Sequence, residues 1–210
     1  NRNKHKLIYG KKHPSNDHIG VGGVDSYDLD STTDNRGSKG ACHLYNKFTL
    51  AAPANMFVAE YASRPPLARI FYEDVLMAAV FYGYPLLIEN NKYGIVRYFE
   101  SRGYEEYVMK RPEHLKSPNS ASTKTRGIPS NSQDVIQAHA HAIEAYVEEH
   151  VGINSETGEF GKMYFSRTLE DWIGYKIDNR TKYDLTISSG LALLGAQKTK
   201  IKKKESSFND

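Results

Sequence analysis

The segment PLLIENNKYG, residues 85–94, decides how this chain is expected to fold. Its proline and aliphatic residues predict a short buried strand, and Asn90 or Asn91 is expected to cap the helix that follows. A helix predicted for residues 66–82 comes directly before the strand. The connection is then a crossover, which is right-handed in nearly all proteins and lays the new strand parallel to an earlier one. The strand ends on Glu89, although glutamate is a poor strand terminator with no capping habit.

Three further strands are predicted before this crossover, at residues 19–28, 40–48 and 56–64. These segments, IGVGGVDSYD, GACHLYNKF and MFVAEYASR, have the length and the β-branched or aromatic content of strands, and Gly, Pro and Asn signals separate them. We expect them to form an antiparallel meander. With a helix at residues 92–103 and a strand at residues 106–112, the expected fold is α/β: a mixed five-stranded sheet, antiparallel in its first three strands and flanked by helices.

The rest of the chain is predicted to be mainly helical. A polar stretch at residues 113–131 has no apolar period and is long for a connection inside a compact domain. Helices are expected at residues 133–151, 168–177 and 183–196. The lysine-rich end, residues 197–210, has too few apolar groups to order itself, so we expect a basic flexible tail.

The composition predicts one globular domain without a membrane segment. The chain has 210 residues, of which 39% are hydrophobic and 25% charged, and its mean hydropathy is -0.62. It contains no apolar run of about 18 residues and no apolar stretch of a secretory signal, so we expect a cytoplasmic protein. Cys42 is the single cysteine, which excludes an internal disulfide. A net charge of +3 points only weakly to nucleic acid.

Three carboxylates are expected to meet at one edge of the sheet. Asp25 ends the first strand and Glu89 ends the fourth, and ligands of α/β sheets bind at the carboxyl ends of parallel strands. Asp184 begins the last helix and joins them if that helix packs on the same sheet. Three partly buried acids repel one another unless cations lie among them. Mg²⁺ prefers oxygen ligands, and a pair of such ions can hold the attacking and leaving oxygens of a phosphodiester, so the set predicts a metal-dependent nuclease.

Each acid also has an ordinary structural interpretation. Aspartate at a strand end is commonly a turn former, and aspartate at a helix start is commonly a cap or a partner of the helix dipole. Taken alone, Asp25 and Asp184 favour these interpretations. Only the combination with Glu89 favours a functional site.

The chain resembles the C-terminal nuclease domain of the large terminase subunit of tailed bacteriophages, the DNA-packaging motor. The resemblance rests on GVDSYDLDSTTDNRGSKGACHLYNK, PLLIENNKYGIVRYFESRG and YDLTISSGLALLGA, which together frame residues 19–196. It is closest to terminases with a D-x-Y-D-x-D segment and an E-N-N segment. The resemblance implies an RNase H-like fold, whose order of strands and helices agrees with the one predicted above.

This resemblance also implies site residues and partners. The three acids would be catalytic and would bind two Mg²⁺ or Mn²⁺ ions, and Asp30 would be a further ligand, a role open also to Asp28 or Asp34. The implied substrate is double-stranded concatemeric viral DNA, cleaved during genome packaging in the cytoplasm of the infected bacterial host. The implied partners are the portal protein and other motor subunits, with no membrane.

Two features depart from the family. Its members often have two adjacent acids at the third position, whereas Leu185 follows Asp184 here. Packaging motors also carry an ATPase domain, and this sequence contains no G-x-x-x-x-G-K-[ST] phosphate loop. We therefore expect a nuclease domain at residues 19–196, cut from a longer protein. Residues 1–18 would be a basic extension or linker from the ATPase domain, and residues 197–210 the tail.

Several cationic side chains are candidates for contacts with DNA. Lys116, Lys124 and Arg126 lie in the polar stretch and could contact phosphates, although a solvated loop is an equally good interpretation. His139 and His141 lie two residues apart on a predicted helix and point in different directions. We expect surface or groove histidines there rather than a shared metal site.

Two other functions compete with the packaging nuclease. Another RNase H-like enzyme, such as a resolvase or a transposase, would share the acids and act on a different DNA structure. A catalytically silent module that binds DNA or the portal would keep the acids as structural residues and use the basic tail. Loss of metal binding would identify the silent module.

Overall fold

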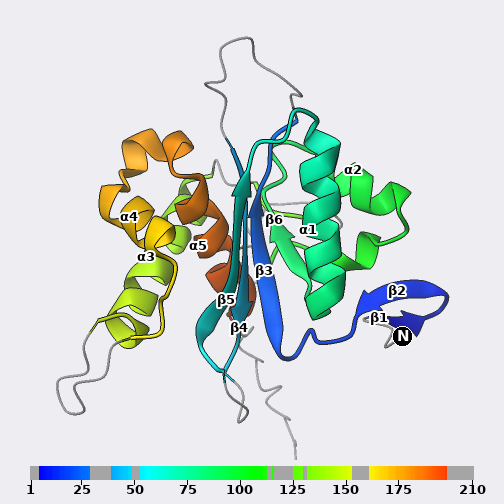
Figure 1. Ribbon diagram of the computed structural model, residues 1–210, viewed down its shortest axis with the longest axis horizontal. Coiled ribbons are helices and arrows are strands. Elements are labelled where there is room, and N and C mark those ends of the chain that lie inside the picture. The colour runs from blue at the N-terminus through cyan, green and yellow to red at the C-terminus, as the bar shows by residue number, and fades with distance from the viewer. Residues whose placement is uncertain are drawn as a thin grey trace, which may run out of the picture.

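The computed structural model describes residues 5–28, 39–48, 53–112, 115, 125–129, 132–152 and 161–197 (Figure 1). Its strands are β1 (His5–Ile8), β2 (Lys11–Pro14), β3 (Gly20–Asp25), β4 (Gly40–Asn46), β5 (Met56–Ser63) and β6 (Leu86–Ile88). Its helices are α1 (Ala68–Tyr82), α2 (Gly94–Ser101), α3 (Gln133–His150), α4 (Ser166–Gly174) and α5 (Asp184–Ala196), with the 3-10 helices η1 (Glu105–Tyr107) and η3 (Ile177–Lys182). Within these ranges, no helix is long and apolar enough to cross a membrane. The predicted tail lies outside them, apart from its first residue.

The main sheet has the strand order β5-β4-β3-β6. β3 pairs antiparallel with β4, and β4 pairs antiparallel with β5, which confirms the predicted meander. β6 pairs parallel with β3, placing Gly22 opposite Leu86 and Val24 opposite Ile88, as expected for a crossover through α1. The carboxyl ends of β3 and β6 therefore lie at the same end of the sheet.

The described part of the sheet has four strands rather than the five predicted. Two short segments share the outer edge of β6, and each makes only isolated bridges. Met109 N donates to Leu86 O at 2.8 Å, whereas Ile128 N donates to Ile88 O at 2.9 Å. Because β6 has only three residues, one segment pairs with its beginning and the other with its end. Neither segment has room to extend into a regular strand.

Helices cover both faces of the sheet (Figure 1). α1 and α2 lie on one face, where their buried side chains form one cluster with Val24. α3 and α5 lie on the other face, where their buried side chains form a second cluster with Val21. Successive side chains of a strand point to opposite faces, so β3 serves both cores and is buried along its whole length.

Glycine at position 23 lets α5 lie directly on β3. A Cβ atom there would fall 2.1 Å from the carbonyl oxygen of Ser188 and 2.2 Å from the backbone nitrogen of Ala192. The far end of α5 lies beside the start of β3, because Gly195 approaches Val21. The helix thus runs antiparallel to the strand. Its first residue, Asp184, is thereby brought to the carboxyl end of β3.

A separate two-stranded hairpin, β1–β2, lies within the predicted N-terminal extension. Its two-residue turn has φ values of 50° at Tyr9 and 76° at Gly10, the positive φ values that a type I′ turn requires. Lys11 forms ion pairs of 3.2 and 3.3 Å with Glu105 and Glu106 of η1. These contacts anchor the hairpin to the domain.

Candidate functional site

The three acids singled out in the sequence line one small cavity. Asp25 is the last residue of β3, Glu89 directly follows β6, and Asp184 is the first residue of α5. The parallel pairing continues up to the site, because Glu89 N donates to Val24 O at 2.9 Å. The cavity has a volume of about 210 Å³, and its other lining residues are Asn91, Lys92, Arg180 and Ile187.

Asp25 has the most perturbed environment of the three acids. Its side chain is buried, with only 7% of the residue exposed. Burial raises the pKa of the Asp25 carboxyl well above its usual range, and the charge of Glu89, a hydrogen bond with the Glu89 carboxyl and the charge of Asp184 raise it further. The positive charge of Lys92 acts in the opposite direction on this pKa. The site therefore crowds negative charge around one buried carboxyl.

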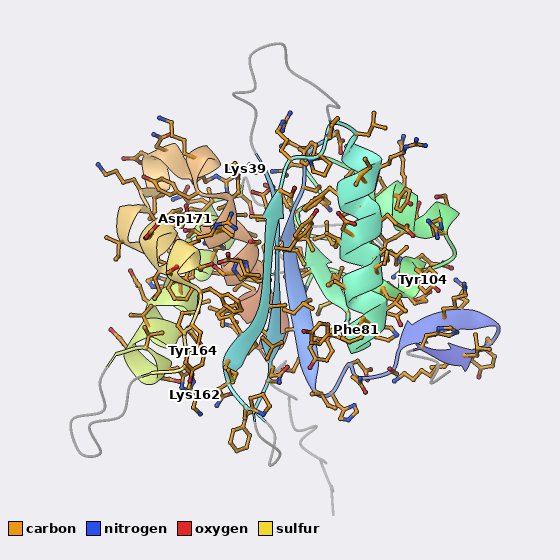
Figure 2. All side chains as sticks on the ribbon, viewed as in Figure 1. Lys39, Phe81, Tyr104, Lys162, Tyr164 and Asp171 are labelled. Atoms are coloured by element: carbon orange, nitrogen blue, oxygen red, sulfur yellow. The ribbon has the colours of Figure 1, made fainter. Side chains whose placement is uncertain are left out.

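Neighbouring donors orient the other two carboxylates. Asn91 Nδ2 donates to Glu89 Oε1 at 2.9 Å. The backbone nitrogen of Lys39 donates to Asp184 Oδ2 at 2.9 Å, and Lys39 lies near the upper end of the molecule in Figure 2. Asp184 also occupies the first turn of α5, where the helix dipole favours a negative charge.

The donor set fits a hard divalent cation in its chemistry. All three acids offer carboxylate oxygens, the ligands that Mg²⁺ and Mn²⁺ prefer, and a cation among them would relieve the repulsion on Asp25. Over the described ranges, however, no three Asp, Glu, His or Cys side chains are already gathered around the position of one ion. The Glu89 and Asp184 side chains are partly exposed. Asp30, the further ligand implied by the resemblance, lies outside the described residues.

The Asp28 side chain accepts a hydrogen bond from the first residue of α2 and so caps this helix, a role predicted for Asn90 or Asn91. Its Oδ1 accepts hydrogen bonds from Gly94 N at 3.2 Å and from the Tyr72 hydroxyl at 2.9 Å. Asn90 instead donates to a backbone carbonyl outside the helix, and Asn91 to Glu89. The predicted cap was wrong because the chain after Ser26 folds back over the start of α2, which a local pattern cannot reveal. Asp34, the other alternative ligand, lies outside the described residues.

The candidates for DNA contacts are described only in part. Lys116 and Lys124 lie outside the described residues. Arg126 Nη2 forms an ion pair of 2.8 Å with Glu106, and Arg126 Nη1 donates to Val108 O at 2.8 Å. These contacts tie the segment beside β6 to η1, so the guanidinium already has a structural role.

The two histidines of α3 have different surroundings, and the predicted surface or groove position is wrong for His139. That residue is only 4% exposed, and its Nε2 lies 3.0 Å from Thr186 O and 3.2 Å from Ile187 O of α5. Burial lowers the pKa of His139 to about 4, so the imidazole is neutral. His141 is exposed and lies 3.3 Å from Glu144, so the two side chains point in different directions, as predicted.

A buried network of hydrogen-bonded polar side chains lies beneath the site and was not predicted from the sequence. His43 of β4 contacts the hydroxyls of Ser188 and Thr168, each at 2.8 Å, and Thr168 donates to Glu60 at 2.6 Å. Ser188 Oγ in turn donates to Asp184 O at 3.0 Å, so the network supports the first turn of α5. Polar residues inside apolar strand and helix patterns were the available signal. Lys92 and Arg180, which line the cavity, were also missed, although each lies close in sequence to one of the acids.

Comparison with known proteins names no relative for this arrangement. The chain matches no protein-family model, and it matches neither a curated protein nor a solved structure. The function must therefore be inferred from the site itself.

Proposed function

We propose that this chain is a divalent-metal-dependent endonuclease of the RNase H-like type that hydrolyses the phosphodiester bonds of double-stranded DNA. The observation that carries the proposal is the single cavity lined by Asp25, Glu89 and Asp184, which lie far apart in the sequence. The setting implied by the resemblance to terminases, cleavage of concatemeric viral DNA during genome packaging, belongs to the same proposal. So do the portal and motor partners.

The sheet topology supports the RNase H-like part of the proposal. Three antiparallel strands precede a helical crossover to a strand parallel to the first, in the order β5-β4-β3-β6. Asp25 and Glu89 lie at the ends of the two parallel strands. Asp184 begins α5, which lies on the opposite face of the sheet from α1. An end of a parallel pair is where α/β folds commonly bind ligands.

The side chains divide the work of the reaction as follows. Bound Mg²⁺ or Mn²⁺ ions would supply a water of lowered pKa and stabilise the leaving oxygen. Asp25 is buried and both other acids raise its pKa, so it would be a metal ligand whose negative charge the bound ions compensate. Asn91 and the Lys39 backbone amide hold the Glu89 and Asp184 carboxylates, which are partly exposed and accessible to substrate.

Nicking and linearisation of supercoiled plasmid DNA test the proposal. The chain should cleave with Mn²⁺ or Mg²⁺ and not with EDTA. Asp25→Asn and Glu89→Gln keep the shape of each side chain and remove its charge, so each should lower the rate by more than about 100-fold. Asp134→Asn, an exposed aspartate in the first turn of α3, is the matched control and should cleave like the unchanged chain. A folded chain that cuts nothing, or acid variants that cut normally, would overturn the proposal.

A catalytically silent binding module is the second candidate. The observation that favours it is that Glu89 and Asp184 each already accept a hydrogen bond from a neighbour. The two candidates differ in metal binding. Titration calorimetry with Mn²⁺ should give heat that Asp25→Asn abolishes if the chain is a nuclease, and no heat if the module is silent.

A further inference from the structure

Two cationic side chains enter the cavity that the three acids line. Lys92 lies in the connection that follows Glu89, and Arg180 lies in η3, just before Asp184. The segments that carry Glu89 and Asp184 therefore each also carry one cationic residue of the cavity. Ions from solution could neutralise an acidic cluster, so the presence of two protein cations beside the acids indicates a further role for these side chains.

Lys92 is directed toward the end of β3 rather than into solvent. Its Nζ donates to the backbone oxygen of Ser26 at 3.3 Å, and the residue is only partly exposed. The ammonium group is thus held beside Asp25, the most buried of the acids. Its charge opposes the rise in the Asp25 pKa, which agrees with this placement.

The charge balance of the cavity indicates what the cations can bind. Three carboxylates face two cations, so the cations compensate part of the acidic charge while the acids are otherwise unoccupied. Divalent ions on the carboxylates would make the net charge of the cavity positive and so strengthen its attraction for a further anion. Guanidinium and ammonium groups are suited to phosphate oxygens, the first through paired N–H donors and the second as a compact charge.

We propose that Lys92 and Arg180 form a phosphate-binding subsite that holds the DNA backbone over Asp25, Glu89 and Asp184. The cavity volume of about 210 Å³ is below the roughly 300 to 1,000 Å³ of pockets that enclose drug-sized molecules, so it suits a phosphate group better than a nucleoside. Its substrate class rests on the proposed nuclease function. Without divalent ions the carboxylates repel the same phosphate, so the subsite should bind it more weakly, but Lys92 and Arg180 should still contribute to binding.

Binding of a short fluorescein-labelled DNA duplex in EDTA, followed by anisotropy, tests the subsite without cleavage. Lys92→Gln and Arg180→Gln should each remove one phosphate contact, lower the slope of log K against log salt by about 0.9 and weaken binding roughly eightfold at about 0.1 M salt. Lys92→Arg should restore most of the binding. Glu89→Gln should act in the opposite direction and bind more tightly, because it removes a negative charge from the same cavity.

Lys162→Gln is the matched control, because Lys162 is an exposed lysine near the lower end of the molecule, opposite Lys39 (Figure 2). Thermal melting verifies that each variant is folded, and Arg180→Gln decides the test if Lys92→Gln does not fold. Folded variants that bind with unchanged affinity and salt slope would overturn the subsite, whatever the plasmid assay gives. If Lys92→Gln or Arg180→Gln loses affinity for the duplex in EDTA while the unchanged chain cleaves no DNA in Mn²⁺ or Mg²⁺, the subsite is supported and the nuclease is overturned.

Discussion

Asp25 shows how far a single side chain could be interpreted from its sequence. The sequence placed it at the end of a strand, and a terminal strand position with two other acids nearby was enough to predict a shared site. Its burial depends on the packing of α5, and its hydrogen bond with the Glu89 carboxyl depends on how the two side chains are oriented, neither of which the sequence could show. The same limit applies to His139, whose burial comes from contacts with α5.

Asp25→Asn should stabilise the metal-free protein. Ionising a buried carboxyl that faces two others costs free energy, so the gain of the variant in the free energy of unfolding in EDTA should grow as the pH rises through the raised Asp25 pKa, to about 0.5 to 2 kcal/mol. Mn²⁺ should then raise the melting temperature of the unchanged chain and have little effect on the variant, because binding to the folded state alone stabilises it. Urea unfolding and thermal melting measure both effects. A variant less stable than the unchanged chain would contradict the repulsion argument.

The contact between β3 and α5 is the element pair on which the site depends. Both elements were predicted within a few residues of their observed bounds, because β-branched content, turn residues and an apolar helix pattern are local signals. Their approach follows from Gly23, whose role becomes visible only when the helix backbone lies over it. The prediction of a fifth strand was wrong because two separate segments share the edge of β6, which has only three residues.

Gly23→Ala should separate α5 from the sheet. The new methyl group would meet two backbone atoms of the helix, at 2.1 and 2.2 Å, and backbone cannot rotate away as a side chain can. We expect a loss of about 1 to 3 kcal/mol in the free energy of unfolding, measured with urea. Gly174→Ala in α4 is the matched control. A Cβ atom at position 174 would lie 3.2 Å from a ring atom of Tyr183, a side chain that can move. The free energy of unfolding should therefore stay the same or rise by up to about 1 kcal/mol.

Across the whole domain, two apolar cores lie on opposite faces of the sheet, and the core on the α3 and α5 side contains buried polar groups. His139 Nε2 faces two carbonyl oxygens of α5, while its Nδ1 has no hydrogen-bond partner among the described residues. A proton on Nδ1 would therefore be buried without an acceptor. Packing of α3 on α5 thus requires the neutral imidazole.

Stability should consequently fall in mild acid. The pKa of His139 is lowered from 6.5 to about 4, so between these values the unfolded chain binds a proton that the folded protein does not. The free energy of unfolding should decrease as the pH falls from 6.5 to about 4, by on the order of 3 kcal/mol from this residue, and this contribution should level off below. Urea unfolding across this range measures the slope. His139→Leu should remove this share of the slope, whereas the exposed His141→Leu should keep it. An unchanged slope in His139→Leu would exclude the assignment.

The sequence alone was enough to predict the antiparallel meander, the parallel crossover and the placement of three acids at the ends of elements, but not the β1–β2 hairpin or the limit of four strands. The predicted features arise from local periodicity, turn residues and the handedness of connections, so neighbouring residues suffice to predict them. The packed chain was needed to bury His139, to cap α2 with Asp28 and to bring Lys92 and Arg180 among the acids. Each of these depends on contacts between segments distant in sequence, whose free energy is set by burial and charge rather than by local pattern.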